Sequence, residues 1–121
     1  MKKILLIEDE RNLHKVLNDY LQGEEIEIIS AFDGEEGIKK AKELKPDVVI
    51  LDLVLPKIQG MDVLRELKKD EVTKHIPIII FTNLHDFNAI QESVECGVNC
   101  YLLKSDYKIE DLLKRVKQVI K

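Results

Sequence analysis

The sequence predicts an α/β domain in which helices cover both faces of a parallel β-sheet. Short apolar segments alternate along the chain with longer amphipathic segments, from the N-terminus to the last residues. This alternation is the pattern of repeated strand–helix–strand units. Several of the apolar segments are apolar at every position, as strands are when helices bury both of their faces. We therefore expect a doubly wound parallel sheet.

Five short segments are expected to form the strands. The first, third and fourth are apolar throughout, which places them in the middle of the sheet. The second alternates in part and exposes Glu25 and Glu27, so we place it at an edge. This arrangement gives the strand order 2-1-3-4-5 of the flavodoxin-like class. The expected strands are Lys3–Ile7, Glu25–Ser30, Val48–Leu51, Pro77–Phe81 and Cys100–Leu103.

Five amphipathic helices are expected between and after these strands, each with apolar residues at helical spacing. Gly23 and Gly97 are natural stops for the first and fourth helices. Asp33 is the expected N-cap of the second, with Glu36 completing a capping box, and Pro46 limits its other end. The expected helices are Asn12–Gln22, Asp33 to about Leu44, Met61–Lys69, Asp86–Cys96 and Ile109–Ile120.

Composition is typical of a soluble, well-folded protein, and we expect a single domain that spans residues 1–121. Apolar residues make up 45% of the chain and charged residues 35%. The net charge is −4, from 19 basic and 23 acidic residues, and the basic residues form no dense stripe, so we expect no direct nucleic-acid binding. We find no signal peptide and no apolar run that could span a bilayer, which favours a cytoplasmic protein without a membrane anchor.

The two cysteines do not predict a metal site. Cys96 and Cys100 lie close together, but the three histidines that could add ligands are scattered along the chain. We expect two reduced, largely buried thiols.

Polar residues follow four of the expected strands. Glu8–Glu10 follows the first strand, Asp52 the third, Thr82 the fourth and Lys104 the fifth. Because right-handed crossovers place the carboxyl ends of parallel strands at one edge of the sheet, these side chains should converge. Asp52 is the most informative of them, because a charge at the end of a buried segment is costly unless it is paired or ligated.

Such a cluster is suited to phosphoryl chemistry. Neighbouring carboxylates resist ionisation unless a cation lies among them, and oxygen ligands favour Mg²⁺. An ammonium and a hydroxyl can stabilise phosphoryl oxygens, and a carboxylate can itself act as the nucleophile. Each residue alone has a simpler explanation, such as a helix start for Glu8–Glu10 or a solvated charge for Lys104. The interpretation depends on their convergence.

The residues at these positions resemble the receiver domain of two-component response regulators, of the chemotaxis-regulator type, over the whole chain. The resemblance implies that Asp52 is the phosphoacceptor. The phosphoryl group would come from a phosphohistidine on a sensor kinase or from a small donor such as acetyl phosphate. The segments that carry the resemblance are ILLIEDE, PDVVILDLVLPKIQGMDVL, PIIIFTN and CYLLKS.

The resemblance also implies a set of Mg²⁺ ligands. Asp9 and Asp52 would bind the ion directly, together with the backbone carbonyl of Val54. Glu8 would hold a metal-bound water. Many members of the family have Asp at the position of Glu8, and the longer Glu side chain should still be able to hold the metal-bound water.

A phosphorylation switch is implied as well. Lys104 would pair with the phosphoryl oxygens, and Thr82 would donate a hydrogen bond to them. The Tyr101 side chain would follow the movement of Thr82 and turn inward. Ser105 replaces the proline that commonly follows the lysine, so a cis bond is less favoured there, because non-proline cis bonds cost about 2.5–4 kcal/mol.

The implied partners are a sensor histidine kinase or phosphotransfer protein and a downstream protein. The partner surface would be formed by the fourth helix, the fifth strand and the fifth helix, and the chain would be a monomer or a phosphorylation-dependent homodimer. Exposed residues expected on this surface are His85, Gln91, Glu92, Glu95, Lys108, Lys114 and Lys117.

Two other classes of protein fit the sequence less well. An interaction module of the same fold that works without phosphorylation would have no need of Asp9, Asp52, Thr82 and Lys104. A Mg²⁺-dependent phosphatase or a flavin-binding enzyme is also less suitable, because Val54 stands where a general acid would be needed and no P-loop is present. We thus expect no enzyme activity beyond self-catalysed phosphotransfer and dephosphorylation. We expect either a free-standing regulator that acts by binding or the receiver part of a longer protein.

Overall fold

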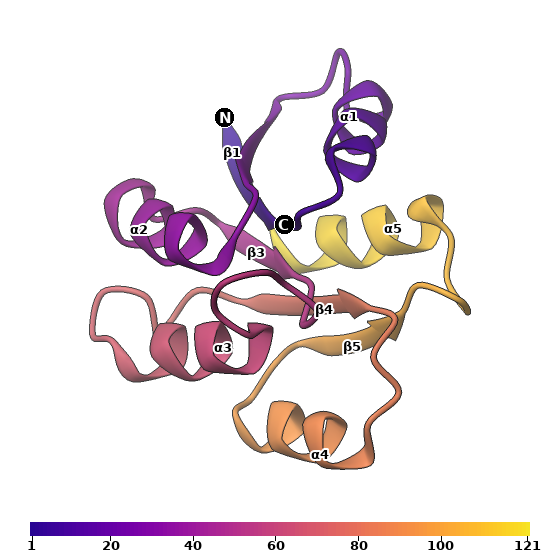
Figure 1. Cartoon of the computed structure of the whole chain (residues 1–121). Helices are drawn as coiled ribbons and strands as arrows, with labels where there is room; N and C mark the ends of the chain where they lie inside the picture. The colour runs from indigo at the N-terminus through magenta and orange to yellow at the C-terminus, as the bar shows by residue number, and fades with distance from the viewer.

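The structure, a computed structural model that describes residues 1–121, contains five strands and five helices in alternation (Figure 1). The strands are β1 (Lys2–Ile7), β2 (Ile26–Ala31), β3 (Val48–Leu51), β4 (Ile78–Thr82) and β5 (Cys100–Leu103). The helices are α1 (Arg11–Tyr20), α2 (Gly34–Leu44), α3 (Gly60–Lys69), α4 (Phe87–Glu95) and α5 (Ile109–Val119). All ten expected elements are present, with small shifts at their ends.

The strands form one parallel sheet in the order β2-β1-β3-β4-β5, which confirms the predicted fold class. Every residue of β3 and β4 is buried, as their apolar sequences predict. The edge strand β2 exposes Glu27. Strand position in the sheet could therefore be predicted from how completely apolar each strand is.

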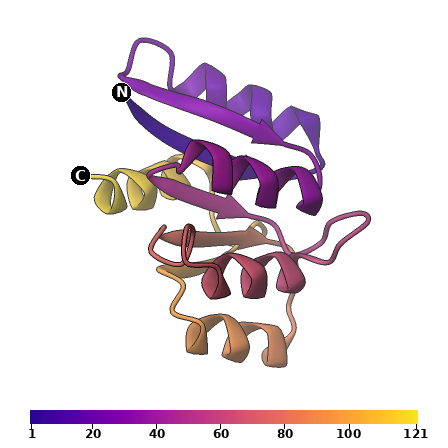
Figure 2. The same ribbon diagram turned by 90° about the vertical axis from the view of Figure 1, so that its left-hand side faces the viewer.

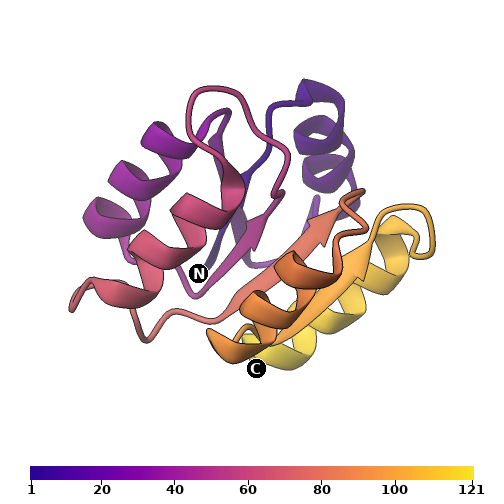
Figure 3. The same cartoon turned by 60° about the horizontal axis from the view of Figure 1, so that its bottom comes forward.

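Two apolar cores lie on the two faces of the sheet. Helices α2, α3 and α4 cover one face, side by side in Figure 3, and α1 and α5 cover the other (Figure 2). Successive strand residues point to opposite faces, so Leu5 and Ile7 belong to the first core and Ile4 and Leu6 to the second. Burial of both faces holds the sheet rigid and fixes where each strand ends.

Several local predictions are also confirmed. Gly97 directly follows the C-cap of α4, and Gly23 lies two residues after the C-cap of α1, with φ angles of 84° and 82° in the left-handed region that favours glycine. The Asp33 side chain accepts a hydrogen bond from the backbone N–H of Glu36 at 2.9 Å. The Glu36 carboxylate reaches the N–H of Phe32, one residue before the expected Asp33.

The two cysteines are free and partly buried. Cys96 packs against the core under α2–α4, whereas Cys100 packs against the core under α1 and α5. The thiols lie on opposite sides of the sheet and cannot pair. All peptide bonds are trans, including Lys104–Ser105. No helix combines the length and the apolar character needed to cross a membrane.

Candidate functional site

The residues expected to converge lie together at the carboxyl edge of the sheet. Glu8 and Asp52 directly follow β1 and β3, Thr82 is the last residue of β4, and Lys104 directly follows β5. Backbone hydrogen bonds continue past the strand ends: the N–H of Asp52 donates to Ile7 O at 3.0 Å, and that of Lys104 to Thr82 O at 2.8 Å. The site residues are therefore held by the sheet itself and not by flexible loops.

Both carboxylate oxygens of Asp52 accept hydrogen bonds. Oδ1 accepts from the Thr82 hydroxyl at 2.7 Å and from the backbone N–H of Val54 at 3.0 Å, and Oδ2 accepts from Lys104 Nζ at 2.9 Å. Asp52 is only 5% exposed. The cost of bringing this charge to the end of a buried strand is offset by three donors, one of them charged.

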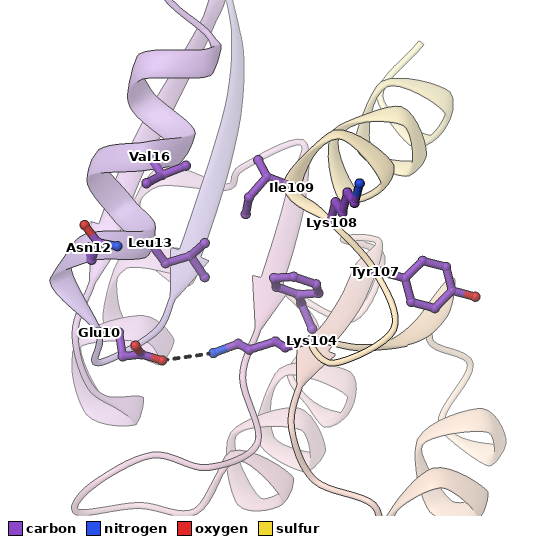
Figure 4. Close-up of a pocket in the computed structure, with 9 residues that line it drawn as sticks. Glu10, Asn12, Leu13, Val16, Lys104, Tyr107, Lys108 and Ile109 are labelled. Atoms are coloured by element: carbon purple, nitrogen blue, oxygen red, sulfur yellow. Dashed lines mark ion pairs between the residues drawn. The ribbon is translucent and has the colours of Figure 1, made fainter.

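Lys104 links the acids of the site. Its ammonium lies 2.5 Å from Glu8 Oε1, 2.9 Å from Asp52 Oδ2 and 3.5 Å from Glu10 Oε1. Figure 4 shows the contact with Glu10 at the rim of a pocket between α1 and α5. Burial alone would lower the pKa of Lys104, but the hydrogen bonds to Glu8 and Asp52 outweigh it, and the pKa is raised above its ordinary value. Lys104 is therefore held as a cation.

Glu8 is almost completely buried, with 1% of its surface exposed. Burial raises the pKa of Glu8 to about 7, the charge of Asp52 adds to this effect, and the hydrogen bond from Lys104 opposes it. The site thus holds more negative charge than one ammonium can neutralise.

This charge imbalance and the oxygen ligands fit a divalent cation. Glu8, Asp9 and Asp52 each offer a carboxylate oxygen, and the three oxygens lie within 4.8 Å of one another. Hard oxygen ligands in such a small cluster, with Asp9 exposed to solvent, suit Mg²⁺, which keeps several of its waters. The residues present therefore fit the ion that the sequence predicts.

A chain of hydrogen bonds connects Asp52 to Tyr101. The Thr82 hydroxyl donates to Asp52 and accepts from the N–H of Leu84 at 3.2 Å, and the Tyr101 hydroxyl donates to Leu84 O at 2.8 Å. Tyr101 also packs against the core under α2–α4, and burial raises the pKa of its hydroxyl. The hydrogen bond to Leu84 O and the contact with the core thus hold the Tyr101 side chain against the segment that follows β4.

Val54 and Leu84 line an apolar pocket next to Asp52 and Thr82. The Val54 side chain is among the more exposed apolar groups of the protein, at 57%. Its backbone N–H faces Asp52. The residues that line this pocket are Leu53, Val54, Leu55, Gln59, Met61, Leu84, Asp86 and Ala89.

Two residues expected on the partner surface make contacts elsewhere. Glu92 accepts hydrogen bonds from Arg65 of α3 at 2.6 and 2.7 Å, which directs it toward α3. Lys117 pairs with Glu24, which follows α1, at 2.9 Å. These contacts draw both side chains toward neighbouring helices, and helical spacing alone does not reveal which neighbour an exposed position faces.

One residue of the site region was missed in the sequence. His14 is 6% exposed, and its Nε2 lies 2.7 Å from the backbone oxygen of Glu8. Burial lowers the pKa of its imidazole. The signal was present, because His14 precedes the buried Leu17 and Leu21 at helical spacing and so falls on the core side of α1.

Comparisons with known proteins agree with this geometry. The family model described as the response regulator receiver domain matches residues 4–117. Response regulator ArlR of Staphylococcus aureus (strain Mu50) is 34% identical over 121 residues, which are 100% of this chain and 53% of that protein. The chain thus spans about half the length of the curated relatives that it matches.

Solved structures of similar proteins cover nearly the whole chain. The Mn²⁺-bound form of response regulator Rcp1 is 32% identical, with a TM-score of 0.79 over 98% of this chain and 91% of that one. The BeF₃-activated N-terminal receiver domain of Klebsiella pneumoniae RstA is 27% identical, with a TM-score of 0.85 over 99% of each chain.

Replacement of Lys104 by Met should destabilise the metal-free protein by about 3 kcal/mol, because Glu8 and Asp52 would be left buried without a counter-ion. Urea unfolding in the presence of EDTA measures this difference. The control is Lys108→Met, which removes an exposed charge and should change stability by less than about 0.5 kcal/mol. Equal unfolding midpoints for the two variants would contradict the role of Lys104 as the counter-ion.

Proposed function

This chain belongs to the family of response regulator receiver domains of two-component systems, and we propose that it accepts a phosphoryl group on Asp52 as a signal. We further propose that residues 1–121 form a single receiver domain. The observation that carries the proposal is the environment of Asp52: a buried carboxylate held by Thr82, Val54 and Lys104 beside two more acids.

The donor is the phosphohistidine of a sensor kinase or phosphotransfer protein, or a small molecule such as acetyl phosphate. A carboxylate oxygen of Asp52 attacks the phosphorus, and an acyl phosphate O–P bond forms while the P–N bond to the histidine breaks. The bonding electrons go to the imidazole, which then takes up a proton. Lys104 favours the ionised nucleophile, and the hydrogen bonds from Thr82 and Val54 fix its direction.

The residues that would hold Mg²⁺ are Asp9 and Asp52, with the carbonyl of Val54 as a further ligand and Glu8 through water. When bound, the ion supplies neutralisation of the charge on the phosphoryl oxygens. Lys104 and Thr82 already donate to Asp52 at 2.9 and 2.7 Å, so a modest movement brings the same donors to oxygens of a phosphoryl group attached there.

The signal then passes through the hydrogen-bond chain that joins Asp52, Thr82, Leu84 and Tyr101. When Thr82 engages the phosphoryl group, the segment after β4 follows it, because Leu84 N–H bonds to the Thr82 hydroxyl. Phosphorylation thereby shifts an existing equilibrium toward the state in which Tyr101 is held inward.

The partner surface is formed by α4, β5 and α5. Its support is the exposed apolar residues Phe87 and Val94 on α4, which are 74% and 64% exposed. Large exposed apolar side chains gathered on one helix are typical of protein interaction sites. The partner is a downstream protein or, after phosphorylation, a second copy of the chain.

Incubation with acetyl phosphate and Mg²⁺ should add one phosphoryl group to the parent protein, detected by intact-mass analysis. Asp52→Asn should gain none, because the amide cannot act as the nucleophile. Asp106→Asn, which changes an exposed carboxyl, is the matched control and should be labelled like the parent. Equal labelling of the Asp52 and Asp106 variants would show that another residue is the phosphoacceptor. Labelling that EDTA does not reduce would show that no divalent cation is needed.

Loss of the phosphoryl group should be slow, because the apolar Val54 and Leu84 cannot orient an attacking water. Val54→Asn, which supplies a polar group beside Asp52, should speed this loss by up to about tenfold, below the effect of a positioned general base. The decay of the phosphorylated mass after removal of the donor measures both rates. Val72→Asn changes another exposed valine and should leave the rate unchanged. A parent half-life of seconds would contradict the prediction.

A further inference from the structure

The imidazole of His14 is fixed on both of its nitrogens. Nε2 lies 2.7 Å from the backbone oxygen of Glu8, and Nδ1 lies 2.8 Å from the hydroxyl of Ser30. A carbonyl oxygen can only accept a hydrogen bond, so Nε2 carries the proton and donates it. In the neutral ring Nδ1 then accepts from Ser30. His14 therefore joins α1 to the carboxyl ends of β1 and β2.

The carbonyl of Glu8 lies where the strand pairing of β1 stops. The β1–β2 pairs end at Ile7 and Ala31, and the N–H of Glu8 makes one further bond, to Ala31 O, at 3.0 Å. Beyond this point His14 supplies the donor to the Glu8 carbonyl. The peptide that leads from Glu8 to Asp9 is therefore held by a side chain in place of the sheet.

Aromatic contacts restrict His14 from a third side. The ring of Phe32 lies 4.4 Å from that of His14, with an interplanar angle of 43°. The guanidinium of Arg11 lies 4.2 Å from the centroid of the same Phe32 ring. Since Arg11 is the first residue of α1, this stack also fixes the end of the loop that carries the acids.

We propose that His14 is a positioning residue for the cation site, through its hydrogen bond to the Glu8 carbonyl. This inference rests on the proposed function, in which Glu8 and Asp9 hold Mg²⁺. Without the bond, a buried carbonyl loses its donor and the peptide that leads to Asp9 is less restrained, which lets the Asp9 carboxylate move away from Asp52, whereas Lys104 still holds the Glu8 carboxylate. Groups that orient metal ligands in this way typically contribute a factor of 10–100 to metal affinity.

Two polar variants separate this role from a purely structural one. In His14→Gln the side-chain amide reaches the former position of Nε2 and can still donate to the Glu8 carbonyl. In His14→Asn the amide reaches only the position of Nδ1, so it keeps a partner in Ser30 and loses Glu8. Both variants remain polar at a buried site, and both lose the aromatic contact with Phe32.

The experiment is calorimetric titration of each metal-free protein with Mg²⁺ at fixed pH and ionic strength, together with thermal unfolding. We expect His14→Asn to weaken Mg²⁺ binding by about tenfold or more, and His14→Gln to remain within about threefold of the parent. Saturating Mg²⁺ should restore labelling of His14→Asn by acetyl phosphate, because His14 does not touch the nucleophile.

Thr73→Val is the matched control. The Thr73 hydroxyl is fully buried and donates to a backbone carbonyl, that of Leu67, at 2.7 Å, but it lies after α3 and outside the site. This variant should lower the unfolding temperature and leave the Mg²⁺ affinity unchanged.

Equal Mg²⁺ affinities for His14→Asn, His14→Gln and the parent, with a lower unfolding temperature for either variant, would overturn the proposal and leave His14 a structural residue. An equal loss of affinity in both variants would also overturn it, because the Gln amide should replace Nε2. Failure of the parent protein itself to bind Mg²⁺ or to be phosphorylated would instead overturn the proposed function, and the inference with it.

Discussion

The ion pair between Lys104 and the two buried acids Glu8 and Asp52 is the interaction on which the site depends. Its members follow three different strands, and Lys104 is separated from Glu8 by 96 residues and from Asp52 by 52. Only the complete sheet brings them together, so the site exists only when the domain is folded. The cost of burying these charges is offset by their mutual contacts and by the hydrogen bonds from Thr82 and Val54.

The same contacts explain why the site suits a cation and a phosphoryl group in turn. Glu8, Asp9 and Asp52 carry more negative charge than Lys104 balances, and burial together with the nearby charge of Asp52 raises the pKa of Glu8. A divalent ion relieves the imbalance. In the proposed function the donors that now hold Asp52 also become the donors for the group attached to it, so little rearrangement is needed at the reacting centre.

Much of the fold could be predicted from the sequence, because burial of the middle strands on both faces leaves them apolar at every position. This pattern predicted the strand order. The handedness of the crossovers predicted that the side chains that follow the strands converge at one edge of the sheet. The faces of Glu92 and Lys117 could not be predicted, since helical spacing separates buried from exposed positions but does not distinguish two exposed sides. His14 was missed because a search for apolar residues at helical spacing passes over a polar one. Its spacing from Leu17 nevertheless places it on the core side of α1.

The central claim is that acids from separate strands hold one divalent cation beside Asp52. The most direct test is anomalous diffraction from crystals of this protein grown with Mn²⁺, which scatters strongly and prefers the same oxygen ligands as Mg²⁺. A single anomalous peak in contact with the carboxylates of Asp9 and Asp52, and within one water of Glu8, is the result expected. No peak at this position in crystals that bind Mn²⁺ elsewhere, for example on the exposed acids of α2, would contradict the claim.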